Sequence, residues 1–368
     1  MNAHDVIVIG TSAGGLEALK ELVSGLPADL AAAVFIVRHT PPDTPSMLPA
    51  LLQRAGKLTA SHAFHGEPIR KGHIFVAPPN HHMMIEDRIV SLTDGPKENR
   101  SRPAVDPLFR SAALTFGNRV VGVVLSGNLN DGTAGLLSVK TLGGISIVQN
   151  PDTAAYPGMP QSALQNVQID HCLHLHEIAP MLVTLAEDPA EEPGGSPMAE
   201  NLKIENRIAR GEYEALSEID RLGKVTPFTC PDCRSSLWQL DGSNLVRFRC
   251  RAGHAFTAEV LLSAQCEAIE NRLADSLRAV QENAALAKFL HTGAETPSPR
   301  HTHSLPPVEE DYRAHFIQQA LIHHNGNSSS QCDESPQSSL IKVPFSYRAS
   351  APSPAEFDRH LPSAQSKI

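Results

Sequence analysis

A serine, a histidine and an aspartate in this chain each follow a run of residues typical of a buried strand. Ser12 lies in the turn GTSAGG, His39 in the sequence RHTPP, and Asp131 in the sequence SGNLNDG. A serine nucleophile needs a neighbouring base, and the base is oriented by a third group. The three residues are therefore candidates for nucleophile, general base and orienting carboxylate. Their chain order, Ser, His, Asp, is unlike the Ser, Asp, His order of α/β-hydrolases.

The glycine-rich turn around Ser12 has two interpretations. A helix that starts behind such a turn leaves N–H groups free to stabilise an oxyanion next to the serine. The same kind of turn is typical of dinucleotide-binding loops. An NAD site would carry Asp or Glu near the end of the next strand, whereas this strand ends in Arg38 and His39. Taken alone, the His and the Asn-Asp-Gly turn each have an ordinary structural explanation. Their convergence at one sheet edge favours the serine interpretation.

Three cysteines and a histidine further along the chain have the spacing of a metal site. Cys230 and Cys233 are separated by two residues, and Cys250 and His254 by three, with sixteen residues between the two pairs. Two short knuckles joined by a hairpin place four such ligands tetrahedrally about zinc. The alternative is four reduced surface residues. The module is too small for a large core, so a structural zinc would supply part of its folding free energy.

A second group rich in histidine does not predict a metal site. It contains His171, Cys172, His174 and His176. The alternation of a short edge strand explains this spacing without a ligand.

The helix predicted at residues 257–290 has a narrow apolar stripe. The stripe consists of Cys266, Ile269, Leu273, Val280, Ala284 and Ala287. It favours packing against the cysteine module; the alternative is a dimer or partner interface.

The elements that must position these residues alternate between strand and helix over residues 1–186. Short apolar runs such as 6–9, 34–37 and 120–125 predict strands, and 84–92 predicts a hairpin. This alternation predicts an α/β fold with a mainly parallel, doubly wound sheet, whose functional loops follow the carboxyl ends of the strands.

The rest of the chain divides by composition. We expect a linker and charged helix at 187–224, a zinc-ribbon-like module at 225–256, the amphipathic helix at 257–290 and a disordered tail at 291–368. The linker is acidic and rich in Pro and Gly, which predicts loose coupling. Residues 1–186 alone are expected to form an active fragment.

Charge and cysteine content limit the function class and the compartment. The formal charge of -9 over 368 residues argues against nucleic-acid binding. No stretch has the pattern of a signal peptide or the length to insert into a membrane. The six cysteines do not form a disulfide framework, because none precedes residue 172. We expect a cytoplasmic protein.

Residues 4–185 resemble the catalytic domain of the CheB-type chemotaxis methylesterases. The matching stretches, in chain order, are IGTSAGG, RHTPP, GHIFVAPPNHH, RPAVDPLFRSAA, GVVLSGNLNDGTAGL and YPGMPQSAL. The resemblance implies a protein-glutamate methylesterase with Ser12 as nucleophile, His39 as base and Asp131 as orienter. It implies methylated chemoreceptors or related signalling proteins as substrates, methanol as product, and glutamine deamidation as a second reaction. It requires no cofactor for catalysis. In the corresponding mechanism, N–H groups of the loops that contain Ala13, Gly14 and Asn128 hold the oxyanion.

One departure from the family pattern bears on the substrate. Chemotaxis enzymes of this type usually carry an N-terminal phosphorylated receiver domain, whereas the first predicted strand here begins at Val6. We therefore expect no receiver and no phosphorylation control in cis. The segment FRCRAGHAFTAEVLLSAQ resembles C-terminal extensions of receiver-less family members. An alternative function is a non-catalytic signalling scaffold that binds proteins through the same fold and the zinc module.

Overall fold

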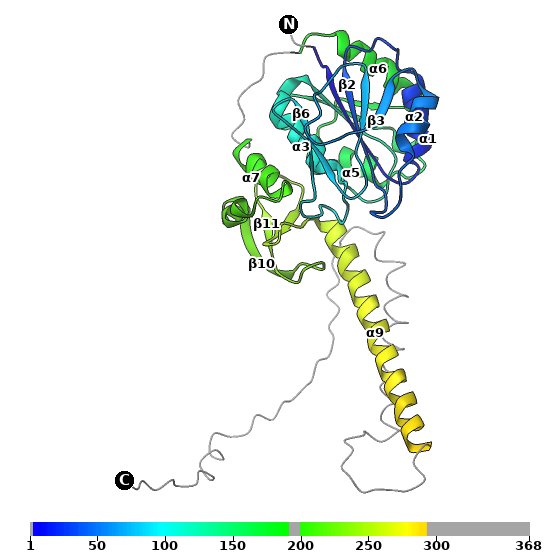
Figure 1. Cartoon of the computed structure of the whole chain (residues 1–368). Helices are drawn as coiled ribbons and strands as arrows, with labels where there is room; N and C mark the ends of the chain where they lie inside the picture. The colour runs from blue at the N-terminus through cyan, green and yellow to red at the C-terminus, as the bar shows by residue number, and fades with distance from the viewer. Residues whose placement is uncertain (1–2, 191–198, 293–368) are drawn as a thin grey trace. The chain divides into compact units, whose positions relative to one another are not determined.

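The computed structural model describes residues 3–190 and 199–292, and residues 3–190 form an α/β domain (Figure 1). Its sheet has seven strands in the order β3-β4-β2-β1-β7-β8-β9, and every pairing is parallel. The strands are β1 (Val6–Thr11), β2 (Ala33–Arg38), β3 (Thr59–His62), β4 (His73–Val76), β7 (Val120–Val124), β8 (Ile145–Gln149) and β9 (His171–Leu173). The predicted mainly parallel sheet is confirmed.

Helices pack on both faces of this sheet. One face is covered by α1 (Gly15–Ser24), α2 (Leu48–Ala55) and α6 (Leu175–Glu187). The other is covered by α3 (Val105–Phe116), α4 (Thr133–Thr141), α5 (Gly158–Asn166) and the hairpin β5 (His82–Glu86) and β6 (Ile89–Thr93). Short 3₁₀ turns lie at η1 (Gly117–Arg119) and η2 (Pro151–Thr153). Successive strand residues point to opposite faces of the sheet. Ile7 therefore packs against α1, α2 and α6, and Val8 packs on the face that carries α3. The hairpin predicted at 84–92 is confirmed.

The strand order determines where the loops of this domain meet. β1 lies between β2 and β7. β2, β3 and β4 all lie on one side of β1, and the chain then returns to add β7 on the other side. Such a reversal leaves a crevice outside the carboxyl ends of the strands, where α/β proteins bind ligands. The loops after β1, β2 and β7 carry Ser12, His39 and Asp131.

The second described segment contains a small antiparallel sheet. It begins with α7 (Ala199–Ala209), η3 (Tyr213–Glu218) and α8 (Ile219–Leu222), and continues with β10 (Gly223–Thr229), β11 (Ser236–Leu240), β12 (Arg247–Cys250) and β13 (Ala255–Thr257). The strands pair in chain order. β11 and β12 pair antiparallel and form the hairpin predicted between the two pairs of ligands. β10 and β13 had no prediction, because β10 is mostly exposed and β13 has only three residues.

Buried charges join this small sheet to the α/β domain. The Glu98 carboxylate accepts hydrogen bonds from Arg110 of α3 at 2.8 Å and from Arg249 of β12 at 2.9 Å. All three side chains are 2% exposed or less. Arg249 also contacts Glu205 of α7 at 3.1 Å. The loose coupling expected from the linker composition is therefore wrong, because desolvated charges hold the two parts together.

The long helix α9 (Ala258–Thr292) is packed only near its start. Val260, Leu261 and Ala264 are buried, and the first two belong to the core of the cysteine module. Leu286, farther along, is 57% exposed. The first turns of α9 thus pack against the module, but none of the six residues of the predicted stripe is buried, so packing of the stripe is not confirmed and the dimer or partner interface stays a prediction. In the described ranges, no helix is both long enough and apolar enough to span a bilayer. The tail predicted from residue 291 lies outside the described residues from residue 293 onward.

His82, at the start of β5, should make the stability of the chain sensitive to mild acid. Its Nε2 donates to Pro96 O at 3.0 Å and its Nδ1 accepts from Ala104 N at 3.2 Å, so the ring is neutral. Burial lowers the pKa of His82 to about 4. Below about 6.5 the unfolded chain binds a proton that the folded chain refuses, so stability falls by about 3 kcal/mol as the pH drops from 6.5 to 4.

Urea unfolding between pH 7 and pH 5 should show about 2 kcal/mol of this loss before most carboxylates titrate. His82→Gln should flatten the dependence, and substitution of its exposed neighbour, His81→Gln, should keep it. An equally steep dependence in His82→Gln would assign it to another group.

Candidate functional site

Ser12 is presented by a tight turn between β1 and α1. Gly14 has φ 70°, and a Cβ there would lie 2.8 Å from Ser126 Oγ and 2.9 Å from Ala155 Cβ. The turn is tied to the loop after β7, since Ser12 N donates to Ser126 O at 3.0 Å. Ser126 Oγ donates in turn to Ala13 O at 2.9 Å. The two loops therefore hold Ser12 in one orientation while its side chain stays partly exposed.

His39 and Asp131 complete a continuous chain of hydrogen bonds that starts at Ser12. His39 Nδ1 lies 3.1 Å from Ser12 Oγ, and His39 Nε2 lies 2.7 Å from Asp131 Oδ2. The His39 side chain is 20% exposed and that of Asp131 is 3% exposed. With the ring proton on Nε2, Nδ1 is free to accept the serine proton. The structure thus brings together all three residues that the sequence singled out as nucleophile, base and orienter.

Asp131 is held by more groups than His39 alone. Its Oδ2 also accepts from Val105 N at 2.7 Å, and its Oδ1 accepts from Gly132 N and Asn99 Nδ2, both at 3.0 Å. Burial by itself raises the pKa of Asp131, but the hydrogen bond and charge of His39 and these N–H donors outweigh it, so the pKa lies below its ordinary value. Asp131 is therefore ionised and fixed in orientation.

A second buried carboxylate, Asp106, lies beside Asp131. Its Oδ1 accepts from Gly132 N at 3.0 Å and from Gly135 N at 2.7 Å, which caps the start of α4. Burial and the charge of Asp131 raise the pKa of Asp106 well above its usual range. Asn99 Nδ2 bridges the two carboxylates, since it also donates to Asp106 Oδ2 at 2.9 Å. Asp106 and Asn99 were not predicted, although Asp106 is part of the RPAVD stretch that carries the family resemblance and Asn99 precedes that stretch by three residues.

Two backbone N–H groups follow Ser12 in the same turn, those of Ala13 and Gly14. Within the described chain, neither Ala13 N nor Gly14 N donates a hydrogen bond. Gly127 packs against Ser12 closely enough that a Cβ at position 127 would lie 2.9 Å from Ser12 Cβ. Asn128, which follows, is exposed in the same loop. A carbonyl oxygen polarised by such donors, next to an activated serine, is the arrangement required for acyl transfer.

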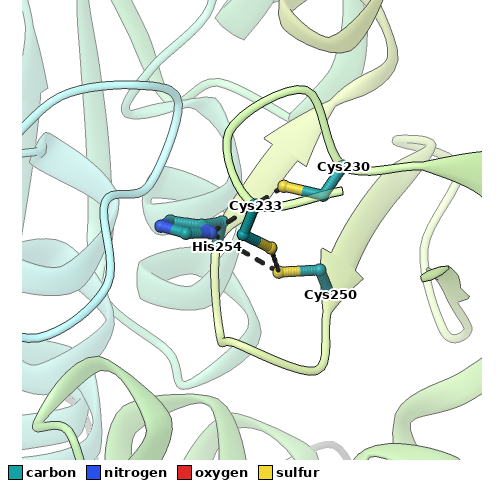
Figure 2. Close-up of side chains that lie close together, drawn as sticks. All are labelled: Cys230, Cys233, Cys250 and His254. Carbon is teal, nitrogen blue, oxygen red and sulfur yellow. Dashed lines mark hydrogen bonds between the residues drawn. The ribbon is translucent and has the colours of Figure 1, made fainter. Parts of the chain in front are cut away.

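The four candidate metal ligands converge in the small antiparallel sheet (Figure 2). Their ligand atoms all lie within 4.8 Å of one another. Cys233 Sγ is 3.6 Å from Cys250 Sγ, and His254 Nδ1 is 3.5 Å from Cys250 Sγ and 3.8 Å from Cys230 Sγ. A tetrahedral zinc site with Zn–S bonds of about 2.3 Å has S–S edges of about 3.8 Å and slightly shorter S–N edges. The observed spacing fits such an ion.

Two backbone knuckles produce this spacing. Arg234 N donates to Cys230 O at 2.8 Å and Gly253 N donates to Cys250 O at 2.9 Å, and Arg234 and Gly253 both have positive φ. Hydrogen bonds from Cys230 and His254 lower the pKa of the Cys250 thiol to about 3. Cys250 is therefore a thiolate, the form of cysteine that binds metals.

The histidine-rich group near residue 171 is not assembled in this way. His171 and Cys172 lie on the edge strand β9, whereas His174 is the N-cap of α6 and His176 lies inside that helix. Within the described chain, only Cys230, Cys233, Cys250 and His254 form a group of three or more with ligand geometry. The edge-strand explanation of these histidines is confirmed for residues 171 and 172.

Comparison with known proteins places residues 7–182 in the family model described as CheB methylesterase. A curated relative from Leptospira interrogans, named a putative protein-glutamate methylesterase/protein-glutamine glutaminase, is 35% identical over 51% of this chain and 98% of its own length. The protein-glutamate methylesterase/protein-glutamine glutaminase of Paraburkholderia xenovorans is 37% identical over 49% of this chain and 50% of its own length. The chain thus spans nearly all of the first relative and about half of the second.

A solved structure also aligns with the α/β domain. The CheB methylesterase catalytic domain of Thermotoga maritima is 31% identical and aligns with a TM-score of 0.48, covering 49% of this chain and 98% of that one.

Proposed function

The chain belongs to the CheB methylesterase family, and we propose that its α/β domain removes methyl groups from glutamate methyl esters of a protein substrate. The observation that carries the proposal is the continuous chain Ser12 Oγ–His39–Asp131, with distances of 3.1 Å and 2.7 Å. It lies at the switch point of the sheet, beside N–H groups that can hold an oxyanion.

The chemistry follows from the positions of the protons. His39 Nδ1 takes the proton of Ser12 as Ser12 Oγ attacks the ester carbonyl, and Asp131 stabilises the charged ring through Nε2. The N–H groups of Ala13 and Gly14 hold the oxyanion, with Asn128 from the loop after β7. The bond between the acyl carbon and the methoxy oxygen then breaks, and the methoxide leaves as methanol with the proton from His39. Water, deprotonated by His39, then hydrolyses the acyl-enzyme and leaves a carboxylate. Each step uses side chains of this chain and water, so the proposal requires no cofactor.

We propose methylated chemoreceptors, or related methylated signalling proteins, as the substrate. The curated relatives are named for both methylesterase and glutaminase activity. One acyl-enzyme serves both, because an attacked glutamine side chain releases ammonia where an ester releases methanol. A scaffold role gains no support from a complete and hydrogen-bonded Ser–His–Asp set.

The test is to incubate the protein with a receptor fragment carrying methyl-labelled glutamate esters and to follow released methanol. Mass spectrometry of the same fragment detects deamidated glutamines. A fluorophosphonate probe, read out by peptide mapping, should label Ser12. Absence of both labelling and methanol would favour the scaffold.

We also propose that Cys230, Cys233, Cys250 and His254 bind one structural zinc ion. Three soft sulfur ligands and one imidazole, in the spacing described above, suit zinc in a closed tetrahedral site. The ion would hold together a module whose apolar core is small, and it would take no part in ester hydrolysis.

Elemental analysis of the purified chain should find about one zinc per molecule. Cys230→Ser should lose most of it, because three ligands cannot close the tetrahedron. Cys172→Ser, which changes an exposed cysteine outside the module, should keep it. A wild-type chain prepared without chelator that contains no zinc would refute the site.

A further inference from the structure

The strand β13 of the small sheet pairs with a segment of the α/β domain that leads to the active site. Ala255 N donates to Lys97 O at 3.2 Å, and Asn99 N donates to Ala255 O at 2.8 Å. Glu98 and Ala255 form a parallel bridge. Residues 97–99 thus extend the small sheet beyond β13. The backbone at Asn99, which has φ 48°, is held in place by this pairing.

Thr257, at the end of β13, sets the orientation of the Asn99 amide. Thr257 N donates to Asn99 Oδ1 at 3.1 Å, so the opposite end of the amide, Nδ2, faces Asp131 and Asp106. A flipped amide would turn its oxygen toward the ionised Asp131 carboxylate, leave Thr257 N without its acceptor and remove one of the donors to Asp131 Oδ1. The flip is therefore strongly disfavoured while the backbone N–H of Thr257 faces the amide.

Thr257 also contacts the residue that precedes Asp131. Its Oγ1 donates to Asn130 Oδ1 at 2.6 Å, and Asn130 Nδ2 donates to Glu259 at the start of α9. Asn130 is fully buried and Thr257 is 1% exposed. Two routes therefore lead from the β13–α9 junction to Asp131, one through Asn99 to its carboxylate and one through Asn130 to its backbone.

We propose that Thr257 and Asn99 are positioning residues for Asp131, so that the small cysteine-bearing sheet is a working part of the active site. The proposal rests on the esterase function proposed above. His254, the last candidate metal ligand, lies three residues before Thr257, so an ordered metal module fixes the junction that supports Asp131. On this basis the α/β domain alone should hydrolyse esters more slowly than the full chain.

The test uses the full chain and two variants. Thr257→Val removes the hydroxyl that contacts Asn130 and Val260 N but keeps the backbone N–H that contacts Asn99, whereas Asn99→Gly removes the amide itself. Thr257→Val should lower kcat about tenfold with little change in KM, because the change acts through Asn130 on the placement of Asp131 and not on substrate binding. Thr257→Ser should restore kcat because it keeps the hydroxyl. Asn99→Gly keeps the left-handed backbone and should lower kcat by about a hundredfold, since it removes a direct donor to Asp131.

Thr226→Val is the matched control. Thr226 Oγ1 donates to Leu237 O and accepts from Phe228 N within the same sheet, much as Thr257 Oγ1 donates to Asn130 and accepts from Val260 N. It should lose a comparable amount of thermal stability and keep its kcat. An equal fall in kcat in Thr226→Val would overturn the proposal, because the effect would then be general loosening of the sheet.

A second readout does not depend on hydrolysis. The proton that His39 Nε2 shares with Asp131 should give a low-field NMR signal, identified by its loss in Asp131→Ala. The signal should shift in Thr257→Val and Asn99→Gly and stay in Thr226→Val. Unchanged signal and kcat in the first two variants would overturn the positioning role. A wild-type chain without hydrolysis would contradict the esterase, while shifted signals would still support the positioning.

Discussion

Ser12→Ala is expected to abolish methanol release from a methylated receptor fragment, and Asp131→Asn to lower kcat by about 10⁴. Alanine leaves no nucleophile in the turn. Asparagine keeps the shape of Asp131 but presents an N–H₂ group to His39 Nε2, which drives the ring proton onto Nδ1. Nδ1 faces Ser12 Oγ at 3.1 Å and can then no longer accept its proton.

Ser12→Ala should unfold at nearly the wild-type temperature, which separates lost chemistry from lost folding. Ser138→Ala is the control: its buried hydroxyl donates to Ala134 O at 2.9 Å inside α4, with no contact to the site. This variant should keep wild-type kcat. Activity within tenfold of wild type for Ser12→Ala would remove Ser12 from the site.

Glu98→Gln is expected to destabilise the chain by about 3–5 kcal/mol, since removing one partner of a buried ion pair leaves the others uncompensated. Arg110 and Arg249 both bond to this carboxylate and are almost fully buried. A neutral amide would face two guanidinium groups with one acceptor oxygen. Urea unfolding at pH 7 measures the loss. Glu17→Gln, which removes only an exposed pair with Lys20, should leave the free energy of unfolding almost unchanged.

The pH dependence of this loss has a definite sign. Burial raises the pKa of Glu98, but Arg110 and Arg249 outweigh it and hold the pKa far below its ordinary value. The carboxylate therefore contributes stability above the unfolded pKa of about 4.3, and this stability is lost only as the pH falls through the lowered folded pKa. The difference between Glu98→Gln and wild type should be constant from pH 8 to pH 6. A difference below 1 kcal/mol at pH 7 would contradict the prediction.

Local patterns in the sequence were enough to predict the parallel sheet, the hairpin at 84–92 and the positions of Ser12, His39 and Asp131 at strand ends. Apolar runs of strand length, separated by helical periodicity, specify an α/β fold because each element must bury its apolar side. The group of four candidate metal ligands could also be predicted from local sequence. Its members form two pairs, and the short spacing within each pair holds the two ligands close together whatever surrounds them.

The tertiary structure alone decided how the carboxylate is supported and how the two parts of the chain are joined. Asn99 and Thr257 are 158 residues apart, and no local pattern connects an isolated Asn with an isolated Thr. The linker composition even indicated independent parts, because composition reports the flexibility of the linker and not the contacts that form beyond it. Glu98, Arg110 and Arg249 resemble ordinary surface charges in the sequence. Only the packing of β12 and β13 against the α/β domain removes them from water and makes them partners.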